Sequence, residues 1–109
     1  MEWIEAGVDD QDYQVVKLSG ECDLYSAPSF ARAMIERIES GACRLKLDLT
    51  EVKYLDSTGV GALIRILQTA KHSGCAMFFC GISGSPREVL QMSNILLLMH
   101  EEDHTGGEP

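Results

Sequence analysis

Apolar and polar residues alternate most strictly at residues 44–49, where three leucines are separated by Arg44, Lys46 and Asp48. A period of two places successive side chains on opposite faces of a strand. We therefore predict a strand here, with the leucines on a buried face and the charged residues on a face open to water. Such a sheet needs cover on one side only, so we expect the helices mainly on one face.

Other segments also have the composition of strands. Residues 2–6 and 13–20 flank a turn with one glycine and several aspartates, which predicts a hairpin. Residues 75–82 form a continuous apolar run, which predicts a strand at the centre of the sheet. The segment 95–100 fits either the end of a helix or a last short strand, so we expect four to five strands.

Three helices are predicted, and the first two show the three-to-four-residue apolar spacing that is typical of helices. The first follows Ser26, a predicted N-cap, and has Pro28 in its first turn. The second is predicted at residues 57–73. The third is predicted to have Ser85 as its cap and Pro86 at its first position. A hairpin followed by alternating helices and strands indicates an α/β domain with a mixed sheet.

Composition narrows the functions to consider. The 109 residues fit one domain, which we place at residues 1–100, and residues 101–109 are expected to be an acidic, disordered tail. The net charge is −8 and the nine Lys and Arg residues are scattered, which argues against nucleic-acid binding. Because neither a membrane-spanning stretch nor a secretion signal is recognisable, we expect a cytoplasmic protein without direct membrane insertion.

The four cysteines lack the paired spacing of a metal site, and no histidine completes a cluster. They are Cys22, Cys43, Cys75 and Cys80. We expect buried, reduced thiols, no metal and no other cofactor.

The segment from Asp56 to Gly61, DSTGVG, leads into the second predicted helix and has several interpretations. In the first, Asp56 or Ser57 caps the helix and the two glycines permit close packing against the sheet. In the second, Ser57 is a hydrolase nucleophile, but a base beside it and the first glycine of G-x-S-x-G are both missing. In the third, the segment binds phosphate, but it has no lysine and its aspartate would repel the anion.

The fourth interpretation is phosphorylation of Ser57. A phosphate adds about −1.5 to −2 charges to an exposed hydroxyl. The start of a helix tolerates an anion, whereas a partner docked over the serine would be repelled by the phosphate and Asp56 together. The modification would act as a switch on binding rather than on folding.

Residues 45–67, LKLDLTEVKYLDSTGVGALIRIL, closely resemble the STAS domain of bacterial anti-sigma factor antagonists. In that family a strand ending in aspartate is followed by a hydrophobic residue, Asp, Ser, then Ser or Thr, Gly, a hydrophobic residue and Gly. Residues 20–28, GECDLYSAP, look like the family's segment between the second strand and the first helix. The resemblance covers residues 14–94 and implies a single STAS-type domain. The segment MSNILLLMH lacks the family's Gly-Leu step and following aromatic residue.

The resemblance implies a partner-switching protein and not an enzyme. In the family, the unphosphorylated antagonist binds an anti-sigma factor that is also a serine kinase, and a sigma factor is released. The kinase then phosphorylates the serine after the motif aspartate, which corresponds to Ser57, and a serine phosphatase resets the system. We expect the free protein to be monomeric.

The outward face of the second helix is expected to bind the partner. The apolar stripe predicted to face the core comprises Val60, Leu63, Ile64, Leu67 and Ala70. By analogy with the family, Asp23 is expected in a loop near the motif. Ile66 is expected at the edge of both faces of the helix. The expected partner-binding residues are Asp23, Asp56, Ser57, Thr58, Gly61, Ala62, Arg65 and Ile66.

Two other functions stay open. Single STAS domains also serve as accessory subunits that bind the ATPase of ABC transporters, where the motif hydroxyl needs no phosphorylation. The Ser-Thr pair after Asp56 favours the switch. A small hydrolase or nucleotide-binding enzyme would need a base or basic phosphate contacts near Ser57.

Overall fold

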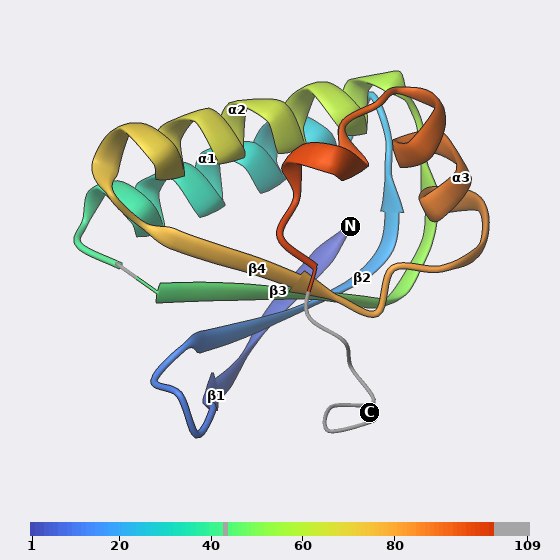
Figure 1. The fold of residues 1–109 in the computed structure, drawn as a ribbon. Coiled ribbons are helices and arrows are strands. Elements are labelled where there is room, and N and C mark those ends of the chain that lie inside the picture. Colours follow the sequence, from blue (N-terminus) through green and yellow to red (C-terminus); the bar gives the residue numbers. More distant parts are fainter. Residues whose placement is uncertain (43, 102–109) are drawn as a thin grey trace.

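The chain folds into two layers, a sheet and a pair of long helices that cover one of its faces (Figure 1). The structure is a computed structural model, and it describes residues 1–42 and 44–101. Four strands form the sheet in the order β1–β2–β3–β4. The predicted α/β class, the mixed sheet and the placement of the helices mainly on one face are confirmed. In the described part of the chain, no helix has the length and apolar character needed to cross a membrane.

The sheet begins with the predicted hairpin. Strands β1 (Glu2–Val8) and β2 (Gln14–Cys22) are antiparallel, whereas β2, β3 (Arg44–Leu55) and β4 (Ala76–Cys80) run parallel. The hairpin turn is held by the Asp9 carboxylate, which accepts hydrogen bonds from the backbone N–H groups of Gln11 and Tyr13. Parallel pairing brings the carboxyl ends of β2 and β3 to the same edge of the molecule.

Strand β4 lies at the edge of the sheet, so its predicted central position is wrong. An apolar run does not require two neighbouring strands if other groups cover it. The ring of Phe78 lies 5.1 Å from that of Tyr13, and the backbone N–H of Phe79 donates to the carbonyl of His100 at 2.9 Å. Contacts across the sheet and from the returning chain therefore bury β4.

The alternation in β3 is confirmed for its leucines, all of which are buried, but not for Asp48. Only 9% of Asp48 is exposed, and its Oδ1 accepts hydrogen bonds from the backbone N–H and the hydroxyl of Thr50. Gly81 has a φ of +74°, and a Cβ at this position would lie 2.8 Å from that Oδ1. Glycine thus lets the chain after β4 close over Asp48, and local hydrogen bonds replace water.

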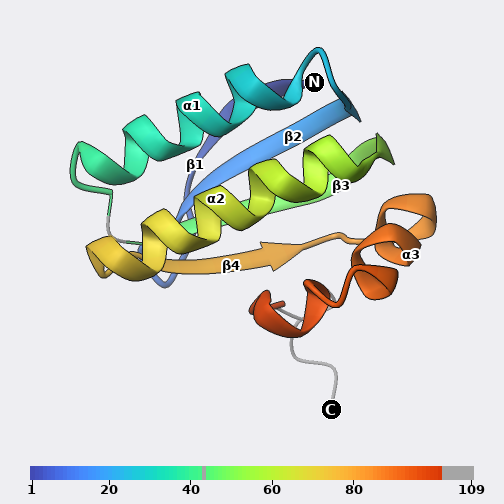
Figure 2. The same ribbon diagram turned by 90° about the horizontal axis from the view of Figure 1, so that it is seen from above.

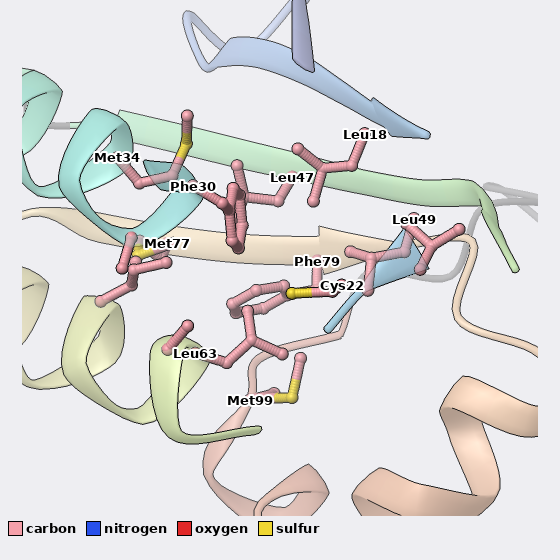
Figure 3. Close-up of a cluster of buried hydrophobic side chains, with 14 of the residues drawn as sticks. Leu18, Cys22, Phe30, Met34, Leu47, Leu49, Leu63, Met77, Phe79 and Met99 are labelled. Atoms are coloured by element: carbon pink, nitrogen blue, oxygen red, sulfur yellow. The ribbon is translucent and has the colours of Figure 1, made fainter. Parts of the chain in front are cut away.

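Helices α1 (Ala27–Glu39) and α2 (Ser57–Ser73) lie side by side on the sheet (Figure 2). The side chains between the layers come from both helices, three strands and the segment after α3 (Figure 3). They include Leu18, Phe30, Met34, Leu47, Leu49, Leu63, Met77, Phe79 and Met99. The thiols of Cys22, Cys75 and Cys80 are buried, as predicted, and Cys43 lies outside the described residues.

The third helix, α3 (Gly84–Met92), begins two residues earlier than predicted. Its N-cap is Ser83 rather than Ser85, because the backbone N–H of Arg87 already bonds to the carbonyl of Ser83. Pro86 is therefore the third helical residue, where its missing N–H is still of no consequence.

The segment after α3 is a 3₁₀ helix, η1 (Leu96–Leu98), followed by one bridge of Glu101 to Phe79. It is therefore neither a continued helix nor a full strand. Glu101 is held by both terminal nitrogens of Arg87, at 2.7 and 2.9 Å. The predicted disordered tail otherwise lies outside the described residues.

Candidate functional site at the start of helix α2

The predicted site lies where two parallel strands end beside each other. Cys22, the last residue of β2, pairs with Leu55, the last residue of β3. The backbone N–H of Asp56 donates to the carbonyl of Cys22 at 3.2 Å, which ties the two chain segments together. The loop after β2 and the start of α2 are therefore neighbours at the carboxyl edge of the sheet, a common place for binding sites in α/β folds.

Asp56 is the cap of α2. Its backbone is extended and its Oδ1 accepts from the backbone N–H of Gly59 at 3.0 Å. This settles which of the two proposed residues caps the helix. Ser57 is the first helical residue and is exposed, and its hydroxyl makes no hydrogen bond within the described residues. The hydroxyl is therefore free to react or to contact another molecule.

The two glycines of the motif have different roles. A Cβ on Gly59 would lie 2.5 Å from Leu55 Cδ1 and 2.7 Å from the carbonyl oxygen of Cys22. Glycine is thus needed for the first turn of α2 to rest on the ends of β2 and β3. A Cβ on Gly61 would have nothing within 4 Å. The predicted close packing therefore applies to Gly59 only. At Gly61, one turn after Ser57, the absence of a side chain leaves a shallow depression in the helix surface.

The face of α2 that meets the core differs from the predicted one. Ala62 is 3% exposed, so its predicted place on the outward face is wrong. Ile66, expected at the edge of both faces and as a binding residue, is fully buried. Ile64, predicted to be inside, is 38% exposed. The buried face of α2 is rotated about the helix axis relative to the predicted face. Glycine and alanine contribute little to a hydrophobic pattern, yet they are among the residues of α2 that pack most closely against the core. The buried residues of α2 are Gly59, Val60, Ala62, Leu63, Ile66 and Ala70.

We call the opposite face the outer stripe of α2. At 100° per residue, residues three and four apart share a face, so the stripe begins at Ser57. It comprises Ser57, Gly61, Ile64, Arg65 and Gln68, of which Gly61 is half-buried and the others are exposed. Thr58 is half-buried beside it.

Asp23 organises the loop after β2. Its Oδ1 accepts from the backbone N–H groups of Tyr25 and Ser26, at 3.0 and 3.1 Å, and from the Ser26 hydroxyl. The hydrogen bond from the Ser26 N–H is the main reason that the pKa of Asp23 lies below its ordinary value. Ser26 occupies the N-cap position of α1 as predicted, but its side chain makes no capping bond to the helix. Asp23 therefore acts as a turn residue in this structure.

This loop presents two apolar side chains that were not predicted as site residues. Leu24 is 62% exposed and Tyr25 is 88% exposed. Exposed aromatic and aliphatic side chains on a rigid loop are typical of protein interfaces. Asp23 and Ser26 are residue types that form turns, and residues inside a turn are usually exposed. This sequence signal could have predicted that Leu24 and Tyr25 lie on the surface.

The chemistry available at this site is limited. Burial, reinforced by the negative charge of Asp56, raises the pKa of the Cys22 thiol to about 11, so it is protonated and a poor nucleophile. His72 lies at the far end of α2, about 22 Å along the helix from Ser57, too far to act as its base. Within residues 1–42 and 44–101, no group of three or more His, Cys, Asp or Glu side chains could hold a metal ion.

Sequence comparison gives a clear match. The profile of the STAS domain matches residues 5–106. The anti-sigma-B factor antagonist of Staphylococcus aureus (strain NCTC 8325 / PS 47) is 26% identical over 102 residues, which cover 94% of each chain. The protein of the same name from Staphylococcus epidermidis is 26% identical over 94 residues, or 86% of this chain and 87% of its own.

Solved structures share the fold. The anti-sigma factor antagonist SpoIIAA in its unphosphorylated form has a TM-score of 0.76 at 19% identity, and covers 95% of this chain and 90% of its own. An anti-sigma factor antagonist from Mycobacterium paratuberculosis has a TM-score of 0.75 at 19% identity, over 92% of this chain and 85% of its own. Taken with the profile match, which spans most of the sequence, these similarities show that the chain belongs to the STAS domain family.

Proposed function

We propose that this chain is an anti-sigma factor antagonist whose binding is switched off by phosphorylation of Ser57. The observation that supports this most directly is the exposed hydroxyl of Ser57 at the start of α2, next to the capping carboxylate of Asp56. This hydroxyl makes no hydrogen bond to any residue that the structure describes. The names of the curated relatives point to the same function. They name a role in antagonising another protein, which supports a binding protein rather than an enzyme.

The proposed binding surface joins the outer stripe of α2 to the loop after β2. Of the residues expected from the sequence, it keeps Asp23, Asp56, Ser57, Thr58, Gly61 and Arg65. It loses the two buried residues of α2 and gains Leu24, Tyr25, Ile64 and Gln68, which are exposed. The missing side chain at Gly61 would allow a partner to approach Ser57 closely. The exposed apolar side chains around it would pack against the partner and exclude water from the contact.

Phosphorylation at this point would change binding more than folding. The added group carries about −1.5 to −2 charges, and the N-terminus of α2 tolerates an anion. A partner that covers Ser57 would bury this charge beside the Asp56 carboxylate without a matching cation, which is costly. The switch is therefore electrostatic and local.

The remaining steps belong to the partners. We propose that the anti-sigma factor is itself a serine kinase, which binds unphosphorylated Ser57 and then transfers phosphate to it. A serine phosphatase restores the binding form. The free antagonist is proposed to be a cytoplasmic monomer. The curated relatives are antagonists, so the alternative of an ABC transporter accessory subunit is not favoured.

The test is capture of the partner from lysate of the source organism, with wild type, Ser57→Ala and Ser57→Glu as baits in the presence of ATP. Wild type and Ser57→Ala should capture a serine kinase, and Ser57→Glu should lose it. Ser73→Glu is the matched control, because it adds the same charge about 24 Å away at the other end of α2. Mass spectrometry should find phosphate on Ser57 of the wild type and of Ser73→Glu, and no phosphate at position 57 of the other two baits. Equal capture by all baits, or phosphorylation that persists in Ser57→Ala, would refute the switch.

A further inference from the structure

A groove of about 740 Å³ lies beside the edge strand β4, between the second half of α2 and the segment that contains η1. Met77 and Phe78 of β4 line it together with Leu67 of α2. Leu98 lines the opposite side and is 67% exposed. The groove therefore has apolar walls, and the wall formed by Leu98 is exposed to solvent, where another molecule could contact it.

The groove runs along an incomplete strand edge. The only strand-like pairing on the outer side of β4, within the described residues, is the single bridge between Phe79 and Glu101. The N–H of Phe79 points outward, since it donates to the carbonyl of His100. Peptide groups two residues apart in a strand point the same way, so the peptide group of Met77 also points outward. It faces the groove with no strand beside it in the described part of the chain.

The groove differs in charge from the rest of the molecule. The chain carries 17 acidic and nine basic residues. In the described part of the chain, the basic side chains that line the groove are Lys71 and His100, and no carboxylate is among the lining residues. A ligand for this groove would gain from negative charge.

We propose that this groove binds an extended, acidic peptide segment of a partner protein, which adds a strand to the free edge of β4. Backbone hydrogen bonds to Met77 and alternate apolar side chains against Leu98 would supply binding energy, as in other cases of strand addition. A carboxylate of the peptide would face Lys71.

Two other occupants fit less well. A second copy of the chain also carries a charge of −8, so two copies repel each other. At Glu101, the last described residue, the same chain runs parallel to β4 toward its Cys80 end, which is the direction away from Met77. A peptide from another protein is the occupant that the charges and the strand direction favour.

The groove is independent of the proposed switch. Lys71 and Ser57 are 14 positions apart on α2, or about 21 Å along its axis. Peptide binding should therefore be the same for Ser57→Glu and for the wild type. If the proposed switch fails, the groove proposal is unaffected.

The test is a titration of the full chain with short, capped synthetic peptides, followed by NMR of backbone amides and methyl groups. A peptide of alternating valine and glutamate should bind saturably below about 1 mM and shift the signals of Met77 and Leu98. The matched peptide of valine and lysine should bind at least about tenfold more weakly.

Substitutions locate the binding. Leu98→Glu should weaken the acidic peptide at least about tenfold through charge repulsion and lost apolar contact. Ile4→Glu is the matched control, since Ile4 is 63% exposed on β1 at the opposite edge of the sheet, and should change nothing. Equal binding of both peptides, no saturation below about 1 mM, or shifts confined to other surfaces would overturn the proposal.

The other occupants give distinct results that would also overturn it. A second copy would produce a concentration-dependent dimer in sedimentation, lost in Leu98→Glu. If residues 102–109 fill the groove, a chain that ends at Glu101 would show shifted Met77 and Leu98 signals without peptide.

Discussion

Replacing Gly59 by alanine tests the contact that fixes the first turn of α2. The new Cβ would meet the backbone carbonyl oxygen of Cys22 at 2.7 Å and Leu55 Cδ1 at 2.5 Å. Overpacking a core costs about 1–3 kcal/mol, and a contact with backbone places this substitution near about 3 kcal/mol. Alanine is favoured over glycine in a helix by about 1 kcal/mol. We therefore expect Gly59→Ala to lower the free energy of unfolding by about 2 kcal/mol.

Gly61→Ala is the matched control on the same helix. A Cβ there would meet nothing within 4 Å, so only the helix-propensity gain remains and stability should rise by about 1 kcal/mol. The gap between the two variants, about 3 kcal/mol, isolates the cost of overpacking because the propensity gain is common to both. Urea denaturation with equal m-values measures this gap. If both variants were stabilised equally, the argument that Gly59 is needed for close packing would be refuted.

Two further predictions concern the core-facing side of α2 and the hairpin turn. Ile66→Ala should lower the free energy of unfolding by about 2–5 kcal/mol, whereas Ile64→Ala should lower it by less than about 1 kcal/mol. Urea denaturation measures both, and equal losses would contradict the observed face. The hydrogen bond from Lys46 is the main cause that lowers the pKa of Asp9 from 3.8 to about 2. Since this pKa is lower in the folded state, the contribution of Asp9 to stability is present above about pH 4 and is lost as the pH falls through about 2. Carboxyl chemical shifts across this range measure the pKa. Lys46→Met should move it back toward 3.8, and an unchanged titration would show that another group is responsible.

The bounds of α2 could be predicted because several independent signals agree. Asp56 and Ser57 mark its start, the apolar period is continuous, and Gly74 ends it in a left-handed conformation with a φ of 74°. Likewise, the hairpin and the first half of β3, residues 44–49, follow from composition and alternation, whereas the extension of β3 to Leu55 was not predicted.

The orientation of α2 could not be predicted from the same pattern. Periodicity gives weight to large apolar residues, whereas Gly59, Ala62 and Ala70 are buried because their small size allows close packing. Ile64 is displaced toward solvent as a result. The loss of Ala62 and Ile66 from the predicted surface and the gain of Ile64 follow from this rotation.

Features that depend on distant parts of the chain were also missed. The edge position of β4 depends on strand order, which the run of apolar residues does not encode. The burial of Asp48 depends on Gly81, more than 30 positions later, and the exposure of Leu24 and Tyr25 depends on how the loop after β2 turns. These features arise from tertiary contacts, and the local spacing of apolar residues in the sequence carries no information about them.

The position of Ser57 in the first turn of a firmly seated helix has a consequence for any enzyme that modifies it. Asp56 is bonded to both Cys22 and Gly59, so the hydroxyl cannot be drawn out as part of an extended segment without breaking these contacts. A kinase acting on Ser57 must accept a convex, folded surface in its active site. Recognition then depends on side chains that are far apart in the sequence, and a short linear peptide with the same residues lacks most of what the enzyme would recognise. Under the proposed switch, the phosphate therefore marks only correctly folded molecules.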